Sequence, residues 1–200
     1  MDEKTSRKLK IKLIITIILL ILCLLMMGVG IWASQAGKDR FKGQVSISTL
    51  DIDGKVTAKI NGVARTTGEG YESEKLLWDS ENSKEFEPVT KWEDIDLTFA
   101  DKNSTIEIVV TVENRKVGTG IQVALTASLG DINLETTEKV IGETNIIAYL
   151  VAPERVESAI DAMTPSVATY KVVMKVADRN FSVKATELNV SLVLTNPDGE

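Results

Sequence analysis

Apolar and polar residues alternate with a period of two along five stretches of this chain, all of them from residue 95 onward. The stretch 105–113 shows the pattern most clearly, because its even-numbered residues are all Ile or Val and most of its odd-numbered residues are Thr or Glu. Successive side chains of a β-strand point to opposite faces, so this pattern predicts strands with one buried and one solvated face, as in antiparallel sheets. The other four stretches are 95–99, 121–129, 169–176 and 187–194.

Two further segments extend the predicted sheet structure. The dipeptide Asp53-Gly54 separates the β-like runs 45–52 and 55–63, and it predicts a β-hairpin because Asp-Gly suits a tight two-residue turn. Residues 145–151 are apolar on both faces, which favours a central strand or one covered by another element.

One helix is expected among the strands, at Pro153–Met163. Val156, Ile160 and Met163 would share one helical face there, and Pro165 would stop the helix. We therefore expect an all-β fold, an antiparallel two-sheet sandwich with this one short crossover helix.

An uncharged apolar stretch, Leu13–Ala33, precedes the strands, and thirteen of its residues are Leu, Ile or Val. At about 1.5 Å per residue, a helix of this length spans roughly 31 Å, close to the hydrocarbon thickness of a bilayer. Five Lys or Arg residues precede the stretch and three follow it closely, which favours a cytoplasmic N-terminus. The stretch is expected to be a transmembrane anchor or a signal-peptide helix.

Anchor and cleaved signal stay open as alternatives, because small residues near Ala33 and Ala36 resemble a signal-peptidase site. The chain is expected in the cell membrane, single-pass with its C-terminal domain outside, or secreted after cleavage near Ala33 or Ala36. The expected organisation is a basic cytoplasmic tail at 1–12, the apolar helix at 13–33, a linker at 34–43, an extracytoplasmic sandwich at 44–195 and a tail at 196–200.

Composition removes several classes of function. The chain has no His, and its one Cys, Cys23, lies in the apolar stretch. Nucleophile systems built on His, and ordinary zinc, haem or iron–sulfur ligation, therefore have no residues to use. Residues 1–33 hold five of the 23 Lys and Arg and two of the 29 Asp and Glu, which leaves a net charge of −9 on the rest. Such an acidic domain is a poor partner for nucleic acid, and no cofactor is expected.

The least regular stretch, Arg65–Lys91, and the residue after it hold four of the ten aromatic residues. Long stretches without regular structure are uncommon in compact domains and are often functional. The alternative is that Leu76, Leu77 and Trp78 cover one end of the core while the rest is a solvated loop. The four residues of this candidate partner-binding loop are Tyr71, Trp78, Phe86 and Trp92.

Four aspartates are expected in loops or at strand ends, namely Asp51, Asp53, Asp101 and Asp131. Carboxylates are ligands for Ca²⁺, but no run matches a twelve-residue EF-hand loop, and Asp53 is already explained by its turn. No pair of carboxylates is marked by spacing as the acid and base of a glycosidase. We therefore assign no metal site and no catalytic residue.

The order of segments resembles a group of exported bacterial proteins. An apolar segment ending Gly-Val-Gly-Ile-Trp-Ala is followed by Val-Ser-Ile-Ser, by Leu-Thr-Phe at 97–99, by Ile-Glu-Ile-Val-Val-Thr-Val-Glu-Asn at 106–114 and by Tyr-Lys-Val-Val-Met-Lys-Val at 170–176. This looks like the β-sandwich proteins of Gram-positive bacteria of the camelysin and TasA-like biofilm-fibre type. The resemblance implies a surface β-sandwich and carries over no functional residue. The protease attribution of that family would need a metal site, and this sequence supplies no evident one.

These observations favour an extracytoplasmic structural or protein-interaction module that is not an enzyme. The strand at 45–52, freed by a cleaved leader, is expected to add to the sheet edge of a neighbour. The alternative is a metal- or carboxylate-dependent surface hydrolase. The expected partners are the membrane, through residues 13–33, and a protein partner or further copies of the chain.

Overall fold

The computed structural model describes residues 15–21, 40–48, 52–62, 73–81, 91–99, 103–178, 183–184 and 186–195. The chain divides into two units, Met1–Lys38 and Asp39–Glu200. In the first unit, residues 15–21 form a helix with exposed side chains. No helix within the described part of the chain has the length and apolarity to cross a membrane. The other residues of the expected 13–33 helix, and the tails at 1–12 and 196–200, lie outside the described residues.

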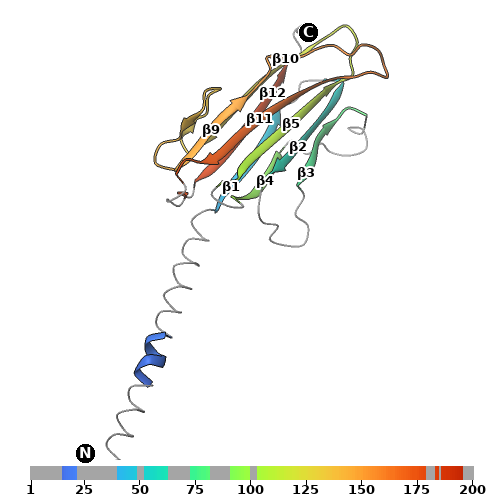
Figure 1. The fold of residues 1–200 in the computed structure, drawn as a ribbon. Coiled ribbons are helices and arrows are strands. Elements are labelled where there is room, and N and C mark those ends of the chain that lie inside the picture. Colours follow the sequence, from blue (N-terminus) through green and yellow to red (C-terminus); the bar gives the residue numbers. More distant parts are fainter. Residues whose placement is uncertain are drawn as a thin grey trace, which may run out of the picture. The chain divides into compact units, whose positions relative to one another are not determined.

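The second unit is a β-sandwich of two sheets (Figure 1). Sheet A consists of β1 (Arg40–Ser48), β4 (Lys91–Thr98), β6 (Ile121–Leu129), β7 (Ile132–Asn133), β10 (Arg155–Val156) and β12 (Glu187–Thr195). Sheet B consists of β2 (Gly54–Asn61), β3 (Glu74–Asp79), β5 (Thr105–Asn114), β8 (Lys139–Val140), β9 (Ile146–Val151) and β11 (Ser166–Val176). The strand order is β10-β6-β12-β1-β4 in sheet A, with β7 beside β6, and β3-β2-β5-β11-β9-β8 in sheet B.

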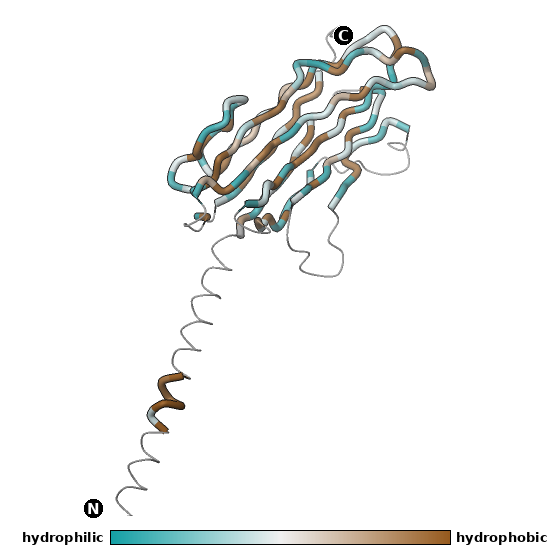
Figure 2. The backbone as a smooth tube through the Cα atoms, viewed as in Figure 1, coloured by the Kyte–Doolittle hydropathy of each residue, from teal (hydrophilic) through white to brown (hydrophobic). Residues whose placement is uncertain are grey.

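The period-two pattern predicted the strands and their buried faces correctly. The apolar members of the five stretches lie in β4, β5, β6, β11 and β12, except Phe99, which directly follows β4, and nearly all of them are buried. Colouring the chain by hydropathy shows the same alternation along the strands (Figure 2). The inner faces of both sheets meet in one hydrophobic cluster, so the all-β, two-sheet expectation is confirmed.

The sequence predicts purely antiparallel sheets, but sheet A is mixed. Its first and last strands, β1 and β12, pair in parallel, while the other described pairs of both sheets are antiparallel. The register places Val45 opposite Val190 and Ile47 opposite Leu192. All four side chains are buried, so apolar side chains match across the first and last strands of the sandwich.

The predicted hairpin around Asp53-Gly54 is wrong, because β1 lies in sheet A and β2 in sheet B. Asp53 and Gly54 instead fasten the start of β2 to its neighbours. The Asp53 carbonyl accepts a hydrogen bond from the Arg115 N–H at 2.9 Å, and the Gly54 carbonyl accepts one from the Ser80 N–H at 2.9 Å. A Cβ on Gly54 would lie 2.1 Å from the Glu113 carbonyl oxygen. Glycine is therefore needed for this close approach and not for a turn.

The predicted crossover helix at Pro153–Met163 is also wrong. The segment holds the short strand β10 and two isolated bridges, one of which joins Val117 to Ala159. Val156 is buried, but Ile160 is 78% and Met163 94% exposed. The three residues expected on one helical face thus divide between core and solvent, because β10 pairs with β6 and draws only Val156 inward.

Two boundaries also change. The strand β1 begins at Arg40, so residues 40–43 of the expected linker belong to the sandwich. The strand β9, expected to be central or under a helix, lies second from the edge of sheet B, between β11 and β8. Its outward residues Ile147 and Tyr149 are half-buried and Val151 is exposed.

Candidate functional site

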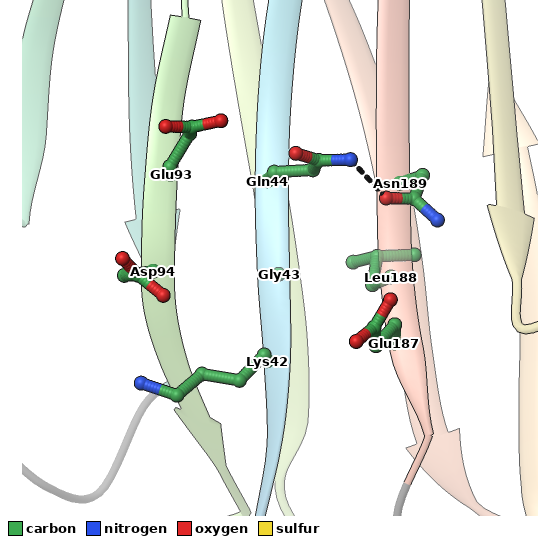
Figure 3. Close-up of a pocket in the computed structure, with 8 residues that line it drawn as sticks. All are labelled: Lys42, Gly43, Gln44, Glu93, Asp94, Glu187, Leu188 and Asn189. Atoms are coloured by element: carbon green, nitrogen blue, oxygen red, sulfur yellow. Dashed lines mark hydrogen bonds between the residues drawn. The ribbon is translucent and has the colours of Figure 1, made fainter.

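A polar groove on the outer face of sheet A is the candidate functional site. It is a pocket of about 260 Å³ at the point where three strands lie side by side, β4, β1 and β12 (Figure 3). The pocket is lined by Lys42, Gly43, Gln44, Glu93, Asp94, Glu187, Leu188 and Asn189.

An irregularity in the edge strand β4 creates this groove. Gly43 lies opposite Ile95 and Val45 opposite Trp92, so two residues of β4 face the single residue between Gly43 and Val45. This is a β-bulge, which shifts the side-chain alternation by one residue. Trp92 and Ile95 would face opposite sides of a regular strand, yet both are buried here. The bulge therefore turns the two residues between them, Glu93 and Asp94, away from the core.

Asp94 adopts the backbone conformation that the bulge requires. Its φ is +55°, in the left-handed region that Asp and Asn tolerate better than most side chains because they bond locally. An observed backbone outlier of this kind is a reason to suspect function nearby. The residue type is therefore matched to its geometry.

Some of the charges in the groove are paired and others are open. The Lys42 ammonium lies 3.0 Å from the Asp96 carboxylate, and the Gln44 side chain donates a hydrogen bond to the Asn189 side chain (Figure 3). Within the described part of the chain, the carboxylates of Asp94 and Glu187 have no ion-pair or hydrogen-bond partner. The groove therefore offers two free carboxylates beside two amide side chains, which suits a cationic or amide-bearing segment of another molecule.

The two described aromatic residues of the candidate loop, Trp78 and Trp92, lie in strands. Trp78 lies in β3 and packs against the core, and its indole N–H is buried without a hydrogen-bond partner among the described residues. Trp92 lies in β4 beneath the groove and is only 8% exposed. Tyr71 and Phe86 lie outside the described residues. Of the residues in the alternative, Leu77 is buried and Trp78 packs against the core, whereas Leu76 is 44% exposed.

Neither β3 nor the bulge was predicted from the sequence. The only buried residues of β3 are Leu77 and Asp79, so its apolar alternation is too short to stand out. The bulge did leave a signal. Two large apolar residues three apart, with two acids between them at Trp92-Glu-Asp-Ile95, break the period of two within an otherwise alternating strand.

A second charged cluster lies at the ends of β3 and β5 in sheet B, and its charged side chains pair with one another. The Arg115 guanidinium lies 2.9 Å from Asp79, 3.3 Å from Glu81 and 2.7 Å from Glu113. Burial works to lower the pKa of Arg115, but its hydrogen bonds to Glu113 and Asp79 outweigh burial and raise that pKa above its ordinary value. This cluster joins the ends of β3 and β5, and its single guanidinium is paired with all three carboxylates, so Arg115 is not an open cation for a ligand.

Two of the four aspartates considered for Ca²⁺, Asp53 and Asp131, are described, and they do not form a metal site. The Asp53 carboxylate accepts a hydrogen bond from Ser80 Oγ at 2.9 Å, and Asp131 is exposed in the turn after β6. Asp51 and Asp101 lie outside the described residues. Among the residues that are described, no group of three or more His, Cys, Asp or Glu is placed to hold a metal ion.

Comparison with known proteins adds no assignment to this geometry. No protein-family model matches the sequence, and no curated protein matches it. The resemblance to camelysin and TasA-like proteins therefore stays a prediction made from the order of the strands.

Proposed function

We propose that this chain is an extracytoplasmic structural or protein-interaction module, and that it binds another protein along the β4 edge of sheet A. The single observation that carries the proposal is the groove beside this edge, with the free carboxylates of Asp94 and Glu187. A terminal strand of a sheet has main-chain N–H and C=O groups on one side that no neighbouring strand uses. An extended segment of a partner adds to such an edge by main-chain hydrogen bonds, and side-chain sites next to it give specificity.

The bulge explains how such an edge avoids indiscriminate pairing. Bulges at sheet edges twist the strand away from regular pairing and so protect against aggregation. Here the bulge interrupts β4 at Glu93 and Asp94 and leaves Ile95–Thr98 paired regularly with β1. A partner that matches this edge would have to bring cationic side chains to the groove, because like charges there would repel it.

The position of β1 supports self-association as one form of this function. The strand β1 is the first of the sandwich and lies between β12 and β4. It therefore fills the strand position between these two neighbours in sheet A, which we call the slot. A chain whose leader is cleaved would carry β1 near its N-terminus, and a second copy then provides a slot of the same shape. Placement outside the cytoplasm follows from the apolar stretch 13–33 and from the resemblance described above.

The experiment compares two pairs of substitutions that remove the same charge. Asp94→Asn with Glu187→Gln neutralises the groove, and Asp131→Asn with Glu143→Gln neutralises two exposed acids elsewhere in the sandwich. Sizing and electron microscopy of the full chain would follow assembly as concentration and pH change, and affinity capture would follow a heterologous partner. We expect the groove pair to lose assembly or capture and the control pair to keep it.

The outcomes separate the forms of the proposal. A wild-type chain that stays monomeric at every concentration and pH argues against self-assembly. Assembly and capture that survive neutralisation of the groove would place the contact elsewhere.

Deletion of the whole stretch 65–91 is unsuitable as a test of the candidate loop because it removes β3, so only 63–72 and 82–90 should be replaced by Gly/Ser linkers.

A further inference from the structure

A tight turn between β10 and β11 holds one methionine out in solvent. The Met163 N–H donates to the Asp161 carboxylate at 2.8 Å, and the Thr164 N–H donates to the Asp161 carbonyl at 3.2 Å. The Ile160 N–H donates to the Thr164 carbonyl at 3.1 Å and closes the turn. These bonds run through main-chain atoms and the Asp161 carboxylate, so the turn does not depend on the Met163 thioether. Met163 is 94% exposed, more than any other large apolar residue in the described part of the sandwich.

Met174 has the opposite environment. It lies in β11 with 0% exposure. The residues opposite it on the two flanking strands are Ile106 in β5 and Ala148 in β9, and both are fully buried. Of the five methionines in the chain, the structure describes these two alone. The described sandwich therefore holds one methionine in water and one in its core.

This contrast matters because a thioether is oxidised at its sulfur atom. A sulfur lone pair attacks one oxygen of hydrogen peroxide, the O–O bond breaks as the S–O bond forms, and proton transfer releases the other oxygen as water. The sulfide is oxidised by two electrons to a sulfoxide, and the peroxide is reduced. No deprotonation of methionine is needed for this step, so access of the oxidant to the sulfur decides which methionine reacts.

No thiol of the sandwich competes for such an oxidant. The only Cys of the chain, Cys23, lies in the apolar stretch 13–33, so residues 39–200, which make up the second unit, contain none. A thiolate reacts with peroxide through its own oxidation ladder, and that route is absent from this unit. The exposed thioether of Met163 is therefore the site where a peroxide meets the sandwich.

We infer that Met163 is a reversible oxidation site, at which the folded sandwich takes one oxygen atom from a peroxide. A sulfoxide at Met163 projects into water, which satisfies its oxygen by hydrogen bonds. The same change at Met174 places a polar oxygen in the core beside Ile106 and Ala148, and a buried polar group without a partner is costly. Oxidation at Met163 therefore leaves the fold intact, whereas oxidation at Met174 disrupts it.

The exposure of the turn also permits the reverse reaction. Methionine sulfoxide is reduced by two classes of reductase, one for each epimer at sulfur. Such an enzyme has to reach the sulfoxide, and the turn presents Met163 at the surface of the folded chain. Oxidation and repair would change the end of the sandwich from apolar to polar and back without unfolding.

The inference goes beyond the proposed function and is independent of it. Met163 lies between β10 and β11, whereas the groove is lined by residues of β1, β4 and β12. Oxidation of Met163 therefore leaves the residues of the groove unchanged, and the two proposals can fail separately.

Peptide mass spectrometry of the oxidised full chain tests the inference. The chain is treated with graded hydrogen peroxide at neutral pH, with and without denaturant, and the sulfoxide fractions at Met163 and Met174 are measured separately. In the folded chain we expect Met163 to react at least about tenfold faster than Met174, because the oxidant reaches only the exposed sulfur. In denaturant the two rates should converge, since both thioethers are then accessible. Equal rates in the folded chain, or faster oxidation of Met174, would overturn the inference.

Two variants and a repair step complete the test. Met163→Leu should remove the early oxygen uptake of the sandwich, and Met174→Leu should keep it. A chain oxidised at Met163 should unfold at the same temperature as the untreated chain, and both classes of methionine sulfoxide reductase together with a thiol reductant should restore the mass of the Met163 peptide. A lowered unfolding temperature, or a sulfoxide that resists both enzymes, would refute a tolerated and reversible modification. Loss of binding at the groove alone would count against the proposed function and leave this inference standing.

Discussion

The two sheets of the sandwich differ in how the charged residues of their edge strands are paired. Sheet B is antiparallel throughout its described pairs, and its edge strand β3 is fastened by the Arg115 cluster with Asp79, Glu81 and Glu113. Sheet A joins the first and last strands of the sandwich through the parallel pair β1 and β12. Its edge strand β4 carries a bulge at Asp94, whose carboxylate has no partner among the described residues. Charges that satisfy each other hold a structure together, whereas charges left open are available to a partner.

The difference also bears on the order of folding. The pair β2 and β5 joins residues about fifty apart, whereas β1 and β12 pair residues 145 apart, as Val45 with Val190. Contacts between residues that are far apart in the sequence lose more entropy on loop closure and slow folding. We therefore expect sheet A to close after sheet B, with β1 as its last interior strand.

The largest effect should come from the core that the two sheets share. Leu192→Ala in sheet A and Ile108→Ala in sheet B each remove a side chain with 0% exposure. We expect each to cost about 2–5 kcal/mol of unfolding free energy because a cavity remains. Denaturant unfolding should show one transition in both variants. Two separate transitions would mean that the sheets are independent units.

The Arg115 cluster should matter more than the ion pair in the groove. Arg115→Ala leaves the carboxylate of Asp79, only 8% exposed, without its guanidinium, and we expect a loss of about 3 kcal/mol. Lys42→Ala removes a pair that is about half-exposed and should cost at most about 0.5 kcal/mol. Equal losses in thermal or denaturant unfolding would contradict the contrast between the sheets.

Alkaline pH should weaken sheet B through Tyr170. Burial raises the pKa of Tyr170 to about 12, above the ordinary value near 10. A raised pKa in the folded state gives stability that is full below pH 10 and is lost as pH rises through about 12. The loss is up to roughly 2.7 kcal/mol, at 1.36 kcal/mol per unit.

The variant Tyr170→Phe should remove this pH dependence. At neutral pH it should be neutral or slightly stabilising, because the buried Tyr170 hydroxyl has no hydrogen-bond partner in the part of the chain that the structure describes, and its removal ends that penalty. The half-buried Tyr149 provides the control as Tyr149→Phe. Unfolding free energies measured between pH 8 and 12 give the comparison, and parallel curves for wild type and Tyr170→Phe would refute it.

At the bulge, the effect on stability should depend on backbone geometry and not on charge. Asp94→Asn keeps a residue type that tolerates the positive φ, so stability should change by less than about 0.5 kcal/mol. Asp94→Val places a β-branched residue in the left-handed region and should cost about 1–2 kcal/mol. Thermal unfolding distinguishes the two. Indifference to valine would mean that the bulge relaxes without strain.

Local pattern was enough to predict the strands but not their partners. The alternation at 105–113 and 187–194 predicted β5 and β12 with their buried faces. Asp53-Gly54 had the composition of a hairpin turn, yet the chain crosses there from one sheet to the other, and Gly54 serves a close approach to Glu113. The helical spacing of Val156, Ile160 and Met163 was overridden because Val156 pairs within sheet A through β10.

The candidate site could not be predicted from local sequence pattern. Aromatic content pointed to Trp78 and Trp92, and both pack into strands instead of an exposed loop. The groove joins Lys42, Asp94 and Glu187 from three strands, and no spacing along the sequence brings these residues together. Only the pairing of β1 with both β4 and β12 does so.

The sequence by itself determined the all-β class, the faces of the main strands, the acidity of the sandwich and the absence of His chemistry. These depend on side-chain alternation and on composition, which act locally or additively. The tertiary structure decided the parallel pairing of β1 with β12, the bulge at Asp94, and the exposure of Ile160 and Met163. Each of these depends on which distant strand lies alongside, and the packing of the shared core makes that choice.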